Sequence, residues 1–441
     1  MSNVIEAPRH FCMLGSQQTV VAIDRAIPIL HCGPGCSNKL WWGLSFFSGF
    51  QASGYACGNS LPCTNLSENE VVFGGEDRLR ETINGALDIM DADLFVVLTG
   101  CVADIVGDDT GRVVREFQSQ GIPIVHAETG GFKGTTYQGY ETVVEAIIKQ
   151  YLDDSPQPVT PGLVNIWSTV PYQDPYWCGN IHALKELLNG IGLKANVLFG
   201  PESDGVEAWK RIPSAQFNLL SSPWTGLNIV QRLKEIYGTP YLHYPMIPVG
   251  AKETGKFLRQ VSEFSGINKN IVETYIKEQE RSFYYYLERA ADFFLEYRCD
   301  LPNYYVTISD SCYTLGVSSF LSNELGIIPG CHYITDETPK EHYERIVSEL
   351  VSPFHKTAGK VRFLSDSGVI YDDLRSLQGL RVPIIIGSDW DKDIASELGT
   401  YHFSLSLPLT NRVIMDRSYI GYQGGLRFVE DMYHSVLGDW L

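Results

Sequence analysis

The chain has few basic residues, and this scarcity excludes one class of partner. Lysine and arginine total 34 against 52 aspartates and glutamates in 441 residues, which gives a formal net charge of −18. Proteins that bind nucleic acids need basic patches to neutralise phosphates, so we expect no nucleic acid partner. The negative charge permits docking to a protein of complementary charge but identifies none.

Long apolar runs, an export signal and dense cysteines are also missing. No apolar run reaches the roughly 18 residues that a membrane span needs, so we expect no membrane partner. Residues 1–9 lack the charged and then apolar order of a secretory signal, and a cytoplasmic location is the default expectation. Ten cysteines are too dilute for a disulfide scaffold. We interpret them as reduced thiols, some of which bind metal.

A nucleotide-binding fingerprint is absent as well. The run Gly130-Gly-Phe-Lys-Gly134 is rich in glycine, but it lacks the Lys-Ser/Thr ending of a phosphate-binding loop. No complete Gly-x-Gly-x-x-Gly motif accompanies it. We therefore expect no nucleotide on this chain.

Strand-like and helix-like segments alternate along the chain, which predicts an α/β fold with parallel sheets flanked by helices. A short helix after residue 19 is expected to break at Pro28 into a buried strand that ends at His31. Further strands are expected at residues 94–98, 122–126, 163–166, 196–199, 218–220, 304–308, 361–364 and 382–386. Helices are expected at residues 76–91, from Asp108-Asp109, which would cap it, and around residues 281–288.

Two shifts in composition mark candidate domain boundaries. Residues 153–162 are polar and rich in proline, and residues 297–303 follow a long helical stretch. A chain of 441 residues is too long for one ordinary core. We predict an N-terminal domain at 1–158, a middle domain at 159–298 and a C-terminal domain at 299–441.

Three cysteines have neighbours, mainly glycines, that leave the backbone beside them accessible. Cys12 precedes Met-Leu-Gly-Ser, Cys36 closes His-Cys-Gly-Pro-Gly-Cys, and Cys101 follows the apolar run 94–98 and a glycine. A thiolate flanked by glycine at the end of a buried strand lets the backbone approach a bulky inorganic cluster. For any one of the three alone, a buried free thiol is the commoner explanation.

Together with their neighbours, these cysteines resemble the K-type (β) subunit of the component-one proteins in the nitrogenase superfamily. The matching motifs follow in order along nearly the whole chain: Cys12 with Gly15, residues 27–31 leading to Gly35-Cys36, Glu70-Val-Val-Phe-Gly-Gly75, Thr99-Gly-Cys101, residues 105–109, and Gly421-Tyr-Gln-Gly-Gly425. The resemblance implies three Rossmann-like domains and a structural role for the last motif.

The resemblance also implies a cofactor and two partners. Cys12, Cys36 and Cys101 would bind half of an eight-iron, seven-sulfur P-cluster, and a D-type (α) subunit would bind the rest in an α₂β₂ heterotetramer. Three thiolates are too few to close a four-cysteine cluster on one chain, which agrees with sharing. Phe73 would face an ATP-dependent homodimeric iron–sulfur reductase. The chain would relay electrons without catalytic residues of its own, and the catalytic iron–sulfur cofactor would lie in the partner.

Departures from the molybdenum-type dinitrogenases narrow the interpretation. Cys12 comes without the long extension that precedes their first ligand, and Gly131 stands where they carry a serine that can ligate the oxidised cluster. These differences favour a nitrogenase-like reductase, first of all a methylthio-alkane reductase, which cleaves carbon–sulfur bonds and releases methanethiol. The alternatives are a dinitrogenase β subunit, an N-type scaffold for cofactor assembly and, more weakly, a tetrapyrrole reductase.

The remaining cysteines have weaker signals. We assign Cys32 to packing, with a cluster ligand as the minority alternative, and leave a small metal site at Cys57 and Cys63 open. Cys178 with His182 has a spacing that suits a metal at a helix start, although packing is favoured. The last three, Cys299, Cys312 and Cys331, are expected to be core thiols.

Overall fold

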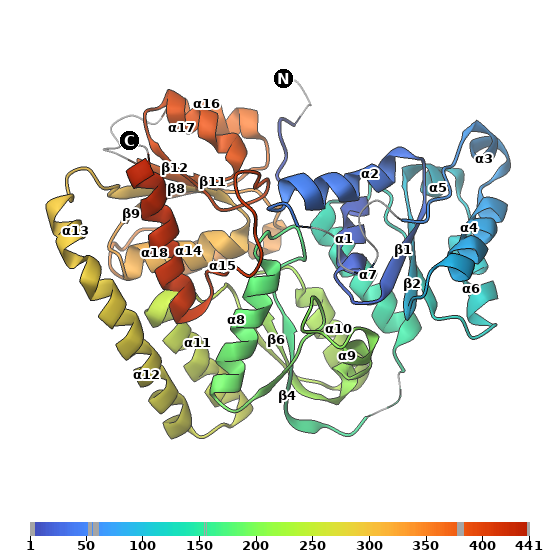
Figure 1. Ribbon diagram of the computed structural model, residues 1–441, viewed down its shortest axis with the longest axis horizontal. Helices are drawn as coiled ribbons and strands as arrows, with labels where there is room; N and C mark the ends of the chain where they lie inside the picture. The colour runs from blue at the N-terminus through green and yellow to red at the C-terminus, as the bar shows by residue number, and fades with distance from the viewer. Residues whose placement is uncertain are drawn as a thin grey trace.

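Three parallel sheets flanked by helices form the framework of the computed structural model, which describes residues 5–51, 55, 61–153, 155, 157–376 and 383–438. Figure 1 shows the first sheet on the right, the second at the bottom and the third at the upper left. The nine pairings between strands are all parallel among the described residues. The predicted α/β class is confirmed.

The first sheet has the order β1-β2-β3, with β1 at Ala26–His31, β2 at Leu94–Thr99 and β3 at Ile124–Ala127. Strands β1 and β2 are buried along their whole length, as strands of a sheet covered on both faces must be. The helices of this part are α1 (Gln17–Val21), α2 (Gly35–Trp42), α3 (Glu68–Phe73), α4 (Glu76–Ile89), α5 (Cys101–Val106), α6 (Thr110–Gln118) and α7 (Thr136–Tyr151).

The second sheet has the order β5-β4-β6-β7. Its strands are β4 (Thr160–Trp167), β5 (Lys194–Asn196), β6 (Ala215–Ser221) and β7 (Tyr241–Tyr244). The accompanying helices are α8 (Trp177–Gly190), α9 (Val206–Lys210), α10 (Leu227–Tyr237), α11 (Gly250–Ser265), α12 (Lys269–Leu287) and α13 (Ala291–Glu296).

The third sheet has the order β10-β9-β8-β11-β12. Its strands are β8 (Tyr304–Ser309), β9 (Ile328–Ile334), β10 (Lys360–Phe363), β11 (Pro383–Gly387) and β12 (Tyr401–Ser404). The helices of this part are α14 (Ser311–Asn323), α15 (Tyr343–Leu350), α16 (Ser367–Ser376), α17 (Lys392–Glu397) and α18 (Gly421–Gly438).

The C-terminal helix α18 joins the helices of the middle part, because it packs against α11 and α12 (Figure 1). A Cβ atom on Gly425 would lie 2.7 Å from the Cα of Gly250, so this approach requires glycine. The glycine motif therefore has a structural role, as expected. Each sheet falls within one predicted domain range, yet one apolar core runs through all three. The domain limits stay a prediction.

Several predicted elements need correction. Strand β1 begins at Ala26, so Pro28 lies inside it, and this is tolerated because β1 is the edge strand of its sheet. The strand expected at 196–199 is wrong because β5 ends at Asn196. A short helix, α5, comes before the one expected near residues 108–109. No helix among the described residues has both the length and the apolar character that a membrane crossing needs.

Candidate metal centre

Cys36 and Cys101 follow the carboxyl ends of two neighbouring strands. β1 and β2 pair in register, with His31 opposite Thr99. Cys101 begins α5 directly after β2, and Cys36 lies in the first turn of α2 after the Gly-Pro-Gly turn. Parallel strands present their carboxyl ends at one edge of the sheet, where ligands bind in folds of this class. The fold therefore delivers both cysteines to the same edge.

Cys12 reaches this edge from the N-terminal segment, which pairs with the loop before α7. Cys12 forms an antiparallel bridge with Thr135, and the N–H of Met13 donates to the carbonyl of Gly134 at 3.1 Å. The Nζ atom of Lys39, one turn after Cys36 on α2, lies 3.1 Å from Cys12 Sγ. These contacts place Cys12 beside the helix that carries Cys36.

The ammonium of Lys39 interacts with all three candidate thiols. Burial lowers the pKa of Lys39, but its hydrogen bond to Cys12 and the charges of Cys36 and Cys101 outweigh burial, so the pKa is raised. A hydrogen bond from Cys32, helped by the charge of Lys39, lowers the pKa of Cys36 to about 6 against the effect of burial. Cys36 is therefore disposed to ionise, and the thiolate is the form that binds metal.

Gly131 lies against two of the three cysteines. Its N–H donates to Cys101 Sγ at 3.1 Å. A Cβ atom built on Gly131 would lie 3.2 Å from Cys101 Sγ and 3.4 Å from Cys12 Sγ. Glycine thus leaves open a cradle between the two sulfurs that any side chain would begin to fill. The structure brings together Cys12, Cys101 and the position at which the resemblance places the missing serine.

The thiols lie at the surface rather than in a closed cage. Cys101 is exposed, and Cys12 and Cys36 are partly buried. Among the described residues, no group of three His, Cys, Asp or Glu side chains is arranged to hold a single metal ion. Soft, open, one-sided donors suit an iron–sulfur group that is larger than one ion and is completed from outside the chain. The residues present therefore fit the implied cluster.

Three of the matching sequence motifs meet beside this edge. Asp108 accepts hydrogen bonds from the N–H of Gly75 at 2.9 Å and from Nε2 of His31 at 3.0 Å. A Cβ atom on Gly75 would lie 2.7 Å from Asp108 Oδ2, so the contact requires glycine. Of the two acidic residues expected to cap a helix, only Asp109 caps α6, by accepting from the N–H of Arg112. The role of His31 was not predicted.

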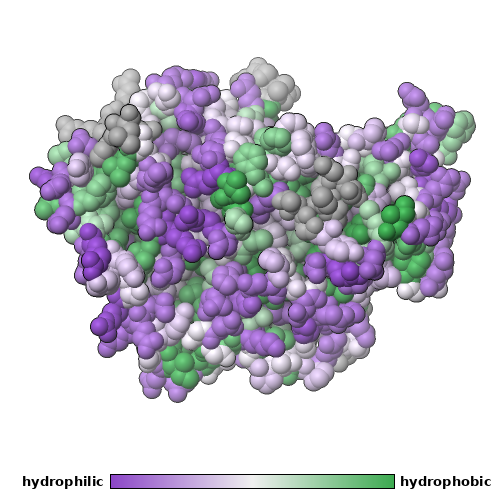
Figure 2. Space-filling model, viewed as in Figure 1, coloured by the Kyte–Doolittle hydropathy of each residue, from purple (hydrophilic) through white to green (hydrophobic). Residues whose placement is uncertain are grey.

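Phe73 is not a core residue. It ends α3 with 85% of its surface exposed, next to the exposed Val72. Helix α3 packs beside α5, whose Ile105 is also exposed. Figure 2 shows apolar surface at this corner, where Figure 1 places α3 and α5. We call Val72, Phe73 and Ile105 the α3–α5 patch. It adjoins Cys101, which begins α5.

The other cysteines divide into three groups. Cys312 and Cys331 are buried, so the prediction that they are core thiols is confirmed. Cys32 is also buried, but its assignment to packing rather than to a cluster stays a prediction. Cys299 is exposed, and the prediction of a core thiol is wrong there because it lies in the turn after α13. Cys57 lies outside the described residues, so the question of a small metal site at Cys57 and Cys63 stays open.

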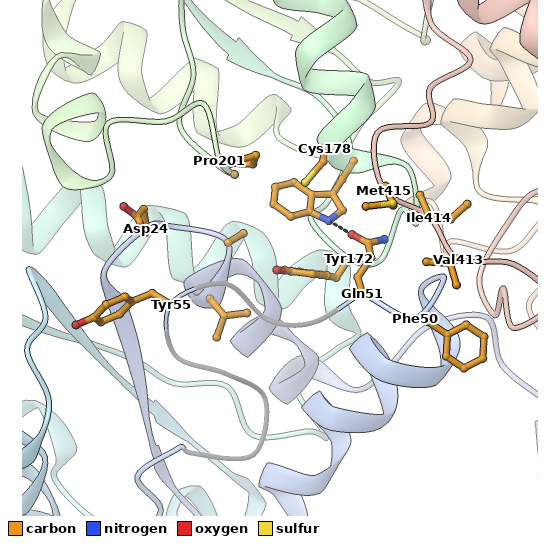
Figure 3. Close-up of a pocket in the computed structure, with 14 residues that line it drawn as sticks. Asp24, Phe50, Gln51, Tyr55, Tyr172, Cys178, Pro201, Val413, Ile414 and Met415 are labelled. Carbon is orange, nitrogen blue, oxygen red and sulfur yellow. Dashed lines mark hydrogen bonds between the residues drawn. The ribbon is translucent and has the colours of Figure 1, made fainter.

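Cys178 lines a cavity of about 700 Å³ between the parts of the chain (Figure 3). Burial raises the pKa of this thiol to about 12, which keeps it protonated. His182 pairs with Glu202, whose Oε1 is 2.5 Å from His182 Nδ1. Gln51 accepts from the indole N–H of Trp177 at 3.0 Å at the cavity wall. This arrangement favours packing over a metal site at Cys178.

The comparisons with known proteins agree with this geometry. A family model described as nitrogenase component 1 type oxidoreductase matches residues 12–437. The chain belongs to this family and is the subunit of an oxidoreductase.

Within the family the chain is like the β subunits. It is 23% identical over 471 residues to the nitrogenase molybdenum-iron protein beta chain of Azotobacter vinelandii, covering 98% of this chain and 84% of that one. The beta chain of Methanococcus maripaludis is 24% identical over 468 residues, covering 96% and 92%. An alpha chain from Methanosarcina barkeri matches 55% of this chain and 44% of its own length at 25% identity. A solved structure, Nitrogenase Cp1 at pH 6.5, has the same fold, with a TM-score of 0.79, 18% identity and coverage of 100% and 94%.

Proposed function

We propose that this chain is the electron-relay β subunit of a nitrogenase-like reductase complex. Cys12, Cys36 and Cys101 hold one side of a P-cluster-type iron–sulfur cluster, and a D-type α subunit holds the other side in a heterotetramer. The observation that supports this most is the convergence of three thiols on one open edge of the first sheet. Reduced thiols of this kind suit a cytoplasmic location.

The residues around the thiols have separate tasks. The ammonium of Lys39 lies 3.1 Å from the sulfur of Cys12, where it would offset the negative charge of a bound cluster and its ligands. The N–H of Gly131 donates to the sulfur of Cys101, and hydrogen bonds of this kind raise the reduction potential of a cluster. When bound, the cluster stores electrons and passes them on. The chain itself holds the ligands, excludes water with the partner and fixes the distances.

The α3–α5 patch is the proposed docking site for the ATP-dependent homodimeric iron–sulfur reductase. An exposed phenylalanine flanked by exposed aliphatic residues is the kind of anchor that dominates protein interfaces. The patch and Cys101 share helix α5, so a docked reductase would lie near the cluster.

For the complex as a whole we propose reduction of methylthio-alkanes to methanethiol at a cofactor in the α subunit. Two electrons and two protons convert the carbon–sulfur bond into a C–H and an S–H bond. The support from this chain is Gly131, which cannot supply the serine oxygen of the molybdenum-type dinitrogenases. Dinitrogen reduction is the second candidate, favoured by the names of the relatives. A cofactor-assembly scaffold is the third.

The test is metal analysis of the complex, purified without oxygen after co-expression of both subunits. Cys101→Ala should lose most of the iron and acid-labile sulfide that this chain shares, and Cys12→Ala and Cys36→Ala should behave alike. Cys299→Ala is the matched control, because it removes an exposed thiol away from the site. Full iron content and turnover in Cys101→Ala would refute the cluster assignment.

Substrate feeding separates the three functions. With its reductase and ATP, the intact complex should release methanethiol from (methylthio)ethanol. Ammonia from dinitrogen without methanethiol would identify a dinitrogenase. A complex that turns over neither substrate but transfers bound cofactor to another protein would be a scaffold.

A further inference from the structure

The end of β1 carries a second pair of thiols, Cys32 and Cys63, that the proposed cluster does not use. Their Sγ atoms lie 3.7 Å apart. The backbone fixes this distance, because residues 62–66 run beside the end of β1. The N–H of Leu30 donates to Pro62 at 2.8 Å, and the N–H of Leu66 donates to the carbonyl of Cys32 at 3.0 Å.

The surroundings keep Cys32 facing its partner. Its backbone N–H donates to the hydroxyl of Thr64 at 3.0 Å. A Cβ atom on Gly100 would lie 2.4 Å from the Cβ of Cys32, so the neighbouring strand end is packed directly against it. Cys32 is fully buried and Cys63 is partly buried. A dissolved reagent therefore meets Cys63 first.

We propose that Cys32 and Cys63 form a reversible dithiol–disulfide site that reacts with low-molecular-weight disulfides. The sulfur of Cys63 attacks the small disulfide, forms a mixed disulfide and releases one small thiol. The sulfur of Cys32 then attacks the sulfur of Cys63 and releases the second. Two electrons and two thiol protons pass from the pair to the small disulfide, which leaves as two thiols. An excess of small thiol reverses both steps.

The pair is linked to the cluster edge through Gly33. The Sγ of Cys63 lies 3.9 Å from the carbonyl oxygen of Gly33, and the same carbonyl accepts the N–H of Cys36, the candidate cluster ligand, at 3.3 Å. Disulfide formation removes the S–H group of Cys63 from that carbonyl, so the oxidation state of the pair reaches the first turn of α2.

The test uses the full chain in its complex, purified without oxygen and incubated with oxidised glutathione. Free thiols are then alkylated and the peptides mapped by mass spectrometry. The expected product is a peptide pair linked through Cys32 and Cys63, which dithiothreitol removes. The link should be absent from Cys63→Ser and unchanged in Cys299→Ser, the control for an exposed thiol elsewhere.

Cys32→Ser tests the order of the two steps. Without the second thiol, Cys63 should keep its bound glutathione, whereas the native chain loses it. If circular dichroism shows that Cys32→Ser does not fold, peptide mapping of the native chain and of Cys63→Ser still tests whether the disulfide forms. Native chain in which Cys63 stays freely alkylated, stays glutathionylated, or leaves Cys32 linked to Cys36 would overturn the proposal.

Discussion

Arg9 anchors the segment that carries Cys12 to the third sheet region, and replacing it should destabilise the chain strongly. Only 3% of Arg9 is exposed, and Asp391 is fully buried. Nη2 and Nη1 of Arg9 lie 2.7 and 2.9 Å from the two carboxylate oxygens of Asp391. Ser367 and Tyr371 accept further N–H groups at 2.9 and 3.1 Å. The guanidinium therefore has its donors satisfied inside the protein.

The size of the effect follows from the charge that remains. Arg9→Met keeps most of the side-chain volume but leaves the carboxylate of Asp391 buried without its cation. Removing one partner of a buried ion pair costs about 3–5 kcal/mol of unfolding free energy. The double variant Arg9→Met with Asp391→Leu leaves no isolated charge. Its loss of unfolding free energy should therefore be smaller than that of Arg9→Met alone, by about 1 kcal/mol or more.

Urea unfolding followed by circular dichroism measures the free energy of unfolding of each variant. The rate at which Cys12 is alkylated reports whether the N-terminal segment has come loose. Arg375→Met is the matched control, since Arg375 makes the same two-pronged contact with Glu397, at 2.7 and 2.9 Å, but at the surface. An exposed pair contributes about 0–1 kcal/mol. The reasoning is refuted if Arg9→Met costs no more than Arg375→Met, or if the double variant is the less stable one.

Three further predictions concern other parts of the chain. Phe73→Ala should weaken binding of the proposed reductase about tenfold in titrations of the complex, whereas Phe354→Ala, which removes another highly exposed phenylalanine, should not. Burial raises the pKa of Asp310 to about 7, so the folded chain retains a proton that the unfolded chain releases; the free energy of unfolding should fall as pH rises from about 4 to about 7, and Asp310→Asn should flatten that slope in urea titrations. Mass spectrometry after brief alkylation at neutral pH should show Cys178 reacting more slowly than Cys299, because burial keeps the Cys178 thiol protonated; equal rates would contradict this.

The long, buried elements of the fold were predictable from the sequence. Strand β2 and the centre of β11 are continuous apolar runs, which is how strands covered on both faces appear in a sequence. Helix α4 has the apolar stripe of a helix that packs on one side, with Leu79, Ile83 and Ala86 buried. In these elements local pattern and final burial agree, so sequence alone identifies them.

Three strands of mixed composition, β7, β9 and β12, were not predicted. β9 contains Pro329 and Gly330 and shifts register against β8, while β7 and β12 have four residues each, including a histidine. Residues 197–199 gave the opposite error, because they are buried and apolar yet lie beyond the end of β5. Burial of apolar side chains does not require strand pairing, so tertiary packing decided these segments.

The candidate site was predictable only in part. Cys12, Cys36, Cys101 and Gly131 were assigned from motifs, and the structure brings Gly131 against two of these cysteines. The contact of Cys63 with Cys32 was missed, because residues 62–66 join β1 through a single bridge that leaves no periodic pattern. The only sequence signal for this contact is that Cys63 follows a proline and comes after a glycine-containing stretch.

Some of the motifs that reveal the family contain the candidate cluster cysteines, whereas others serve the fold alone. His31, Gly75 and Asp108 are far apart in sequence, yet they form one hydrogen-bonded unit in which the glycine is required sterically. Such a unit fixes how α4 and α6 meet the end of β1, whatever the complex reduces. It therefore supports the fold and the family, while the reaction proposed above would depend on the three thiols, on Gly131 and on the proposed α subunit. A change of substrate within this family can accordingly leave most of the recognisable motifs intact.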